Sequence, residues 1–155
     1  MNVATNPDRR SQGFTLIEIM AVVLIIGMLS GIVGFAVFQQ VDKARVVTAR
    51  AQISRLESSL ELYSMDNGRF PSTEQGLEAL IRRPSGSPEP MNYQPGGYLK
   101  GGELPLDPWG NEFQYESPGV NNPDSFDIWS LGKDGQTGGD ELDVDLGNWS
   151  DGASG

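Results

Sequence analysis

The chain has 155 residues, contains neither cysteine nor histidine, and carries a formal net charge of −10 with a pI near 4.3. The lack of cysteine excludes a disulfide framework, and the lack of histidine removes the commonest general base and transition-metal ligand. The acidic balance argues against a nucleic-acid partner, because phosphate binding requires a basic face. Since no nucleophile and base occur in a catalytic motif, the sequence indicates that the protein is not an enzyme.

The first element is an apolar run at residues 14–38, which has 25 residues and a single formal charge, at Glu18. As a helix rising about 1.5 Å per residue, it would be roughly 37 Å long, more than the hydrocarbon core of a bilayer. The apolar region of a secretory signal peptide is shorter, about 7 to 15 residues. The run therefore predicts a transmembrane helix. Basic residues flank it on both sides, so the flanks alone leave its orientation open.

Glu18 needs an explanation, because a carboxylate at the bilayer centre costs about 2.5 to 3.5 kcal/mol. One hypothesis gives it a partner of opposite charge and a functional role. The alternative is that Glu18 lies close enough to the headgroups to reach water without a partner. In the same run, Gly27 and Gly31 form a G-x-x-x-G that permits close helix approach or softens the helix locally.

The helical pattern continues beyond residue 38, and it predicts one helix over about residues 15–64. Its second half is amphipathic, with an apolar stripe that would pack on a soluble domain. The stripe consists of Val41, Ala44, Thr48, Ala51, Ile53, Leu56, Leu60 and Tyr63. Turn residues at 66–72 end the helix. Ser72 and Gln75 then have the spacing of a capping box, which predicts a second short helix over residues 73–83.

The remaining elements predict a small sheet. Residues 84–102 are rich in Pro, Gly and Ser and read as a long surface loop. Two stretches, residues 112–117 and 125–131, alternate apolar and polar side chains, which is typical of strands. The fold class is therefore α+β, with a small antiparallel sheet on the amphipathic half of the helix. Trp109 and Trp149 are interpreted as anchors of the core or of loops.

An acidic loop follows the last predicted strand. Residues 134–145, "DGQTGGDELDVD", hold five acids within twelve residues, together with glycines that let backbone carbonyls turn inward. Such oxygen atoms are the ligands that Ca²⁺ prefers. Gly138 stands where an EF-hand requires Asp or Asn, so the loop is not an EF-hand. By composition alone, a solvated acidic loop without a metal remains the alternative.

Four stretches carry a family resemblance. "GFTLIEIMAVVLIIGML" at residues 13–29 resembles the signal segment of type IV pilins and type II secretion pseudopilins. "NGRFPSTEQGLEAL", "LPLDPWGNEFQY" and "FDIWSLGKDGQTGGDELDVDLGNW" are similar to the major pseudopilins of the type II secretion system. The resemblance spans residues 13–149 and implies the type IV pilin-like fold with a C-terminal calcium-binding loop.

The resemblance implies the following organisation. Residues 1–13 form a prepilin leader, 14–38 a transmembrane and fibre-core helix, 39–149 a periplasmic globular domain and 150–155 a flexible tail. A prepilin peptidase would cleave between Gly13 and Phe14 and methylate the new amino group of Phe14. The leader would face the cytoplasm, so the protein would be a single-pass protein of the bacterial inner membrane until it assembles into a periplasmic fibre.

The resemblance also implies site residues and partners. It favours the functional reading of Glu18, with the Phe14 amino group of a neighbouring subunit as the partner. It favours a calcium ion held by Asp134, Asp140 and Asp143, completed by carbonyls. The implied partners are further copies of the chain, minor pseudopilins, the prepilin peptidase, the inner-membrane assembly platform and membrane lipid, with no nucleic acid. The two carbonyl ligands would belong to Leu131 and Gln136.

The function implied is that of the major structural subunit of the type II secretion pseudopilus, a fibre that drives export of folded proteins across the outer membrane. The alternative is a type IV pilin of an extracellular filament used for adhesion or motility. Such pilins often carry a C-terminal cysteine pair, which this chain lacks.

Overall fold

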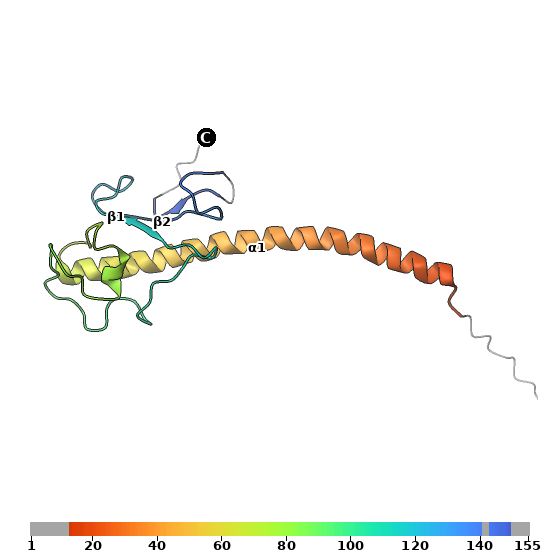
Figure 1. The fold of residues 1–155 in the computed structure, drawn as a ribbon, viewed down its shortest axis with the longest axis horizontal. Helices are drawn as coiled ribbons and strands as arrows, with labels where there is room; N and C mark the ends of the chain where they lie inside the picture. The colour runs from red at the N-terminus through yellow and green to blue at the C-terminus, as the bar shows by residue number, and fades with distance from the viewer. Residues whose placement is uncertain (1–12, 141–142, 150–155) are drawn as a thin grey trace, which may run out of the picture. The chain divides into compact units, whose positions relative to one another are not determined.

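The computed structural model describes residues 13–140 and 143–149, and within the helix it leaves out the side chains of residues 32–39. The chain divides into two compact units, Met1–Gln40 and Val41–Gly155, each described by itself below. The elements are helix α1 (Leu16–Asn67), the 3₁₀ helix η1 (Leu77–Leu80), and strands β1 (Gln114–Glu116), β2 (Asp127–Ser130) and β3 (Leu146–Gly147) (Figure 1).

In the first unit, α1 begins directly after Thr15. The Thr15 hydroxyl accepts a hydrogen bond from the Glu18 backbone N–H at 3.3 Å, and this satisfies one of the donors left unpaired at a helix start. Every side chain described between residues 13 and 31 is exposed, although most are large and apolar. Within the described part of the chain, no helix has the combination of length and apolarity that a membrane span requires.

In the second unit, one face of α1 builds half of the core. Ala49, Ile53, Leu56, Leu60 and Tyr63 are all buried and follow one another at steps of four and three residues. These steps keep side chains on one face of a helix. The predicted stripe is correct from Ile53 onward but wrong before it, because Thr48 and Ala51 are exposed. Stepping back from Ile53 by four and three residues reaches Ala49 and Val46 instead, and both contact the core.

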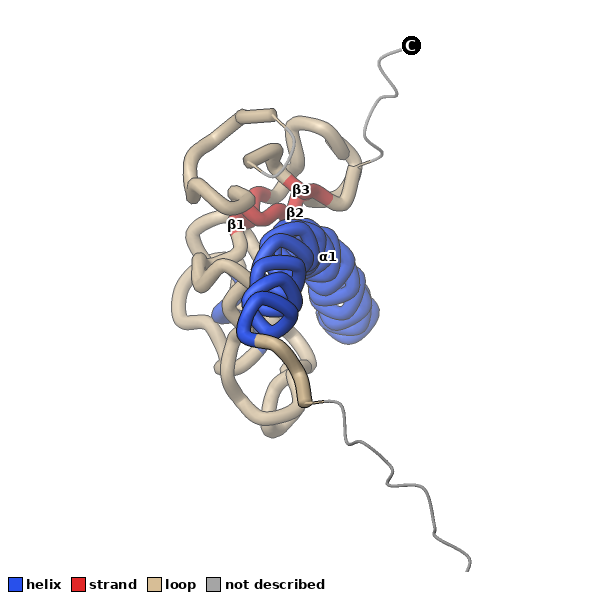
Figure 2. Tube along the Cα trace, turned by 90° about the vertical axis from the view of Figure 1, so that its right-hand side faces the viewer, coloured by secondary structure: helices blue, strands red, loops and turns tan. Residues whose placement is uncertain are grey.

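The other half of the core comes from a three-stranded antiparallel sheet in the order β1-β2-β3. The strands lie along the C-terminal part of α1 in two perpendicular views (Figures 1 and 2). In the register, Tyr115 pairs with Ile128 and Trp129 pairs with Gly147. Ile128 is fully buried in the core cluster that includes Leu56 and Leu60. Strands β1 and β2 confirm the two predicted strands, whereas β3 was not predicted.

The end of α1 is set by Asn67 and Gly68. Asn67 is fully buried, and its side-chain amide donates to the Tyr63 carbonyl and to the Tyr98 hydroxyl, at 2.9 and 3.0 Å. Gly68 has a φ of 73°, a conformation that glycine adopts without steric cost, and its N–H donates to the Ser64 carbonyl. The helix therefore ends three residues later than predicted. Its end lies where Asn67 bonds to the distant Tyr98 and where Gly68 adopts a positive φ.

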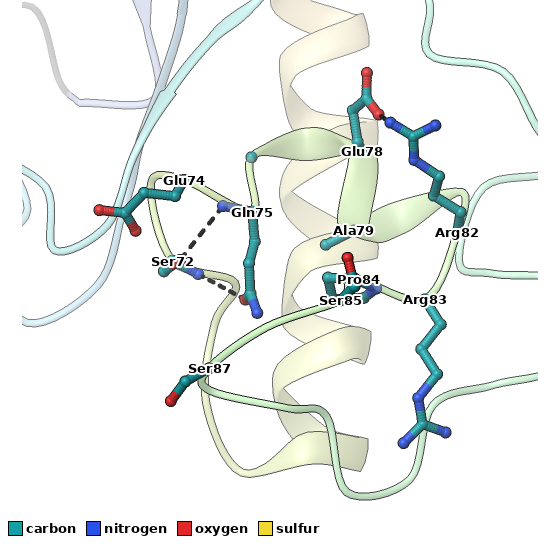
Figure 3. Close-up of a pocket in the computed structure, with 11 residues that line it drawn as sticks. Ser72, Glu74, Gln75, Glu78, Ala79, Arg82, Arg83, Pro84, Ser85 and Ser87 are labelled. Atoms are coloured by element: carbon teal, nitrogen blue, oxygen red, sulfur yellow. Dashed lines mark hydrogen bonds and ion pairs between the residues drawn. The ribbon is translucent and has the colours of Figure 1, made fainter.

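The predicted second helix over residues 73–83 is wrong in type and length. The reciprocal capping-box bonds do form, from the Ser72 N–H to Gln75 Oε1 and from the Gln75 N–H to Ser72 Oγ, at 3.1 and 3.3 Å (Figure 3). However, the next residue, Gly76, has φ 59° and ψ −169°, which is not a helical conformation. The chain therefore leaves the helical path after a single turn, and only the short 3₁₀ helix η1 follows.

Candidate assembly and metal sites

The predicted assembly residue Glu18 lies in the first turn of α1. Its backbone N–H bonds to Thr15, with spacing T-x-x-E, and its charge is at the helix end where the backbone dipoles favour an anion. Sequence reasoning missed this local role of Thr15. Gly13 and Phe14, the predicted processing residues, precede the helix and are exposed. The position and charge of Glu18 therefore suit the first turn of a helix. Glu18 also lies within about one turn of Phe14.

The acidic loop closes on itself through its glycines. A side chain at Gly132 would come within 3.0 Å of the Val144 carbonyl oxygen and 3.1 Å of the Asp143 carbonyl. A side chain at Gly139 would collide with the same Asp143 carbonyl. Gly132, just before the loop, and Gly139, in its middle, therefore both lie against the backbone at Asp143, and a residue without a Cβ permits each approach.

The predicted metal ligands occupy two turns of this loop. Asp134 Oδ1 accepts the Gln136 backbone N–H at 3.0 Å, and the Asp140 carbonyl accepts the Asp143 N–H at 3.0 Å. Leu131 immediately precedes Gly132, so the close approach above brings it beside Asp143 in the fold. Across the described residues, no three acidic side chains gather closely enough to hold a metal ion between them, and Glu141 lies outside that description.

The structure adds one residue that sequence reasoning missed, Asp145. Its Oδ2 accepts the Gly138 N–H at 2.9 Å, while its Oδ1 is buried without a hydrogen-bond partner among the described residues. A buried carboxylate oxygen without a partner is costly, unless a cation or a donor satisfies it. The sequence carried no signal for this role, because Asp145 is placed by the strand β3 that follows it directly.

The loop therefore fits a hard cation in its chemistry. The Asp145 oxygen supplies an unsatisfied buried ligand, and the other ligand atoms in the loop are carboxylate and carbonyl oxygens, which Ca²⁺ prefers over nitrogen or sulfur. Calcium sites need not contain three carboxylates, because carbonyl oxygens and water also serve as ligands.

An ion pair connects this loop to α1. Lys133 Nζ lies 3.8 Å from Asp42 Oδ2, and Arg45 lies 3.6 Å from the other oxygen of Asp42. Both basic side chains are well exposed, so each pair contributes little to stability. The ion pair with Asp42 nevertheless holds Lys133, the residue before Asp134, on the surface of α1.

The predicted tryptophan anchors have different surroundings. Trp109 is half-buried and packs against the core, as predicted. Trp149 pairs with Trp129, with ring centroids 5.9 Å apart, and its ring covers the α-carbon of Gly147 in β3. Trp149 therefore anchors the end of the acidic loop to the sheet.

A polar hollow lies near η1. It is bounded by the Ser72 turn and by Arg82 and Arg83 (Figure 3). Arg82 forms an ion pair with Glu78, and Arg83 donates to the Pro90 carbonyl at 3.0 Å. Both guanidinium groups therefore have partners within the domain.

Comparison with known proteins defines the class of protein. Residues 8–34 match the family model described as the prokaryotic N-terminal methylation motif. Residues 36–149 match the model described as type II secretion system (T2SS), protein G. A long N-terminal helix whose start carries this motif and whose second half packs on a small antiparallel sheet defines the pilin-like class.

Individual relatives agree. The chain is 49% identical over 141 residues to the type II secretion system core protein G of Pseudomonas aeruginosa, covering 91% of this chain and 96% of that protein. It is 46% identical to the Vibrio cholerae protein of the same name, covering 92% and 94%. The crystal structure of the major pseudopilin from the type 2 secretion system of enterohaemorrhagic Escherichia coli matches with a TM-score of 0.62 and 42% identity, over 72% of this chain and 92% of that one. The chain belongs to the type II secretion system protein G family.

Proposed function

We propose that this chain is the major structural subunit of a type II secretion pseudopilus and polymerises with copies of itself into a periplasmic fibre. The observation that carries the proposal is the first half of α1. Its described side chains, at residues 16–31, are apolar with few exceptions, and all of them are exposed. An exposed apolar surface of this extent requires lipid or other protein. The membrane would cover this surface before assembly, and the helices of neighbouring subunits would cover it afterwards.

The apolar run and the family support a membrane arrangement for this proposal. Residues 14–38 would cross the inner membrane once, with the leader in the cytoplasm and the second unit in the periplasm. The fibre would assemble with minor pseudopilins at its end and with an inner-membrane platform at its base. The chain itself would act as a structural subunit, without catalytic activity.

Processing at Gly13 creates the group that Glu18 requires. Cleavage between Gly13 and Phe14 would release an amino group at Phe14, which methylation leaves positively charged. Pairing this group with Glu18 of the neighbouring subunit would neutralise both charges within the apolar fibre core and set the axial register. The helix start at Thr15 supports the proposal, because it leaves Phe14 at the end of the chain after cleavage, outside the helix.

Mass spectrometry of assembled subunits tests the processing step. The mature chain is expected to begin at a methylated Phe14, and a chain that begins at Met1 in the fibre would contradict the proposal. Deletion of the gene tests the function. Exported proteins are expected to accumulate in the periplasm, and normal secretion in the deletion strain would contradict it. A fibre that extends beyond the cell surface in the wild type would favour the type IV pilin alternative.

A calcium ion in the acidic loop completes the proposal. The carboxylate ligands would come from among Asp134, Asp140, Asp143 and Asp145, at most two at once because no three acidic side chains of the described residues lie close enough to share an ion. Leu131 and Gln136 would supply carbonyl oxygens. The unpartnered Asp145 Oδ1 supports this proposal from the structure. The ion would offset the repulsion among the loop's acids and would stabilise a small domain that has no disulfide.

A further inference from the structure

A buried hydrogen-bond chain lies beneath the first residue of the proposed calcium loop. Asp107 and Ser130 are 4% and 0% exposed, and Ser130 Oγ lies 2.6 Å from Asp107 Oδ2. The same hydroxyl oxygen accepts the Gly132 backbone N–H at 3.2 Å. Ser130 ends β2 and Asp107 lies in the loop before β1, so the chain connects the core to the loop.

The chemistry of this chain fixes its direction. An ionised carboxylate can only accept, so the Ser130 hydroxyl must donate its proton to Asp107. The lone pairs of Ser130 Oγ are then left to accept the Gly132 N–H. Asp107 is itself held in place, because its Oδ1 accepts the backbone N–H groups of Trp109 and Asn111, at 3.0 and 2.8 Å.

The orientation of one peptide unit follows. In a planar trans peptide, the carbonyl of a residue points opposite to the N–H of the next residue. Since the Gly132 N–H points to Ser130 Oγ, the Leu131 carbonyl points away from Ser130. The next peptide unit is also held, because Asn111 Nδ2 donates to the Gly132 carbonyl at 3.2 Å. Gly132, with a φ of 68° and with the Asp143 backbone against it, is thus fixed on both sides.

We propose that Ser130 and Asp107 are positioning residues for calcium, which act by aiming the Leu131 carbonyl as a backbone ligand, with Asn111 securing the following peptide. The inference rests on the proposed calcium site. It predicts that residues that never touch the ion determine its affinity, because groups behind a ligand typically change metal affinity by about tenfold to a hundredfold.

Calorimetric titration of the detergent-solubilised full chain with Ca²⁺ after chelation tests the inference. Ser130→Ala removes both the donor and the acceptor, and we expect its Kd to rise at least about tenfold. Asp107→Asn presents an N–H to Ser130 and disturbs the hydroxyl direction, so a smaller rise is expected. Ser130→Thr keeps the hydroxyl and should restore the parent Kd. If Ser130→Ala does not fold, Asn111→Ala, at a half-buried position, decides by the same criterion.

Asp127 provides a matched control. It is also a buried carboxylate, 2% exposed, and it accepts N–H groups from the backbones and side chains of Asn121 and Asn122. Asp127→Asn should lower the melting temperature equally with Ca²⁺ and with chelator, and leave the Kd unchanged. Ser130→Ala should instead shrink the calcium-dependent rise in melting temperature.

The outcomes separate the two proposals. If the parent binds Ca²⁺ and both Ser130→Ala and Asn111→Ala bind it with the parent Kd, the positioning role is wrong and the calcium site stands. If the parent binds no Ca²⁺, the calcium site is wrong and the positioning role falls with it. If Asp127→Asn raises the Kd as much as Ser130→Ala does, the effect comes from general destabilisation, and the positioning role is again wrong.

Discussion

Leu24 and Leu60 belong to the same helix, α1, yet Leu24 is 67% exposed and Leu60 is 0% exposed. The sequence around Leu24 is apolar on every face, whereas the sequence around Leu60 alternates one apolar stripe with charged residues. The second half of α1 therefore finds its cover within the chain, in the sheet and loops of the second unit. The described side chains of the first half, at residues 16–31, are exposed, and we propose that lipid or other subunits cover them. In this proposal the second half serves folding and the first half serves assembly.

The largest expected effect is that of substituting Glu18, which should impair assembly without changing folding. Glu18→Ala should leave the melting of the second unit unchanged but reduce fibre assembly and secretion. Leaving one charge of a buried pair without its partner costs about 3 to 5 kcal/mol, which corresponds to a hundredfold effect or more.

Fibre yield after detergent extraction and exoprotein secretion measure this effect. Ser30→Ala is the matched control, because Ser30 is a polar residue of the same half whose hydroxyl donates to the Ile26 carbonyl of its own helix. It should assemble normally. Wild-type fibre yield from Glu18→Ala would show that the carboxylate serves only the helix start at Thr15.

A pair of leucine substitutions tests the comparison directly. Leu60→Ala should lower the free energy of unfolding by about 2 to 5 kcal/mol, because it opens a cavity in the packed core. Leu24→Ala should change the same quantity by about 0.5 kcal/mol or less, because the side chain has no cover in the monomer.

Denaturant unfolding of the detergent-solubilised chain, followed by the near-ultraviolet signal of the aromatic residues, measures both. Fibre assembly should show the reverse pattern. Leu24→Ala should reduce fibre yield although it barely changes the free energy of unfolding. Equal destabilisation by the two substitutions would mean that the first half of α1 also packs within its own chain.

Calcium should stabilise only the second unit. With free Ca²⁺ at a hundred times the Kd, binding adds about 2.7 kcal/mol to the free energy of unfolding. Asp134→Ala and Asp145→Asn should remove most of this gain, and make the melting temperature nearly independent of chelator. Val144→Thr, at an exposed position in the same loop, is the control and should retain the calcium response. Melting curves of the parent that coincide with and without chelator would identify the loop as a solvated acidic surface.

The smallest effect concerns Glu57, on the second half of α1. Burial raises the pKa of Glu57, a hydrogen bond from Asn148 opposes this rise, and the charge of Glu61 adds to it. A carboxyl with a raised pKa in the folded state stabilises the fold below its unfolded pKa of about 4.3, and this stability is lost as the pH rises through the folded pKa.

At pH 7, Glu57→Gln should therefore have a slightly higher free energy of unfolding than the parent. The gain should be about 1 kcal/mol or less, because the site is partly exposed to solvent. The difference should vanish near pH 4, where the parent carboxyl is protonated. Thermal melts across this pH range provide the measurement. A Glu57→Gln variant less stable than the parent at pH 7 would show that the bond with Asn148 outweighs the burial.

Much of the fold could be predicted because its signals are local. The periodicity of α1 reports which face is buried from Ile53 onward, and the alternating residues mark where β1 and β2 lie, although burial does not alternate along either strand. Two features were not predicted, the first for a local reason and the second because it depends on a distant contact. Gly76 ends the turn after a capping box whose bonds form as predicted. Strand β3 has two residues, too few for a pattern, and exists because Trp129 and Ser130 offer an edge for pairing.

The candidate sites divide in the same way. Glu18 stands out in the sequence because a charge in an apolar run is conspicuous, and the acidic loop stands out by its composition. The choice of ligands within the loop could not be read from composition, because five acids are equivalent until the backbone is folded. Asp145 differs from the others only because β3 holds it where its Oδ1 is buried.

The sequence by itself determined the long helix, its change from an all-apolar to a one-faced half, the lone acid at Glu18 and the acidic loop, because each is a property of residue type and spacing along one segment. The tertiary structure alone decided where that helix ends, which stripe it buries before Ile53, and how Asp107 reaches Ser130, 23 positions further along the chain. Those features depend on side chains that meet only when the chain has folded, and no local pattern records such a meeting.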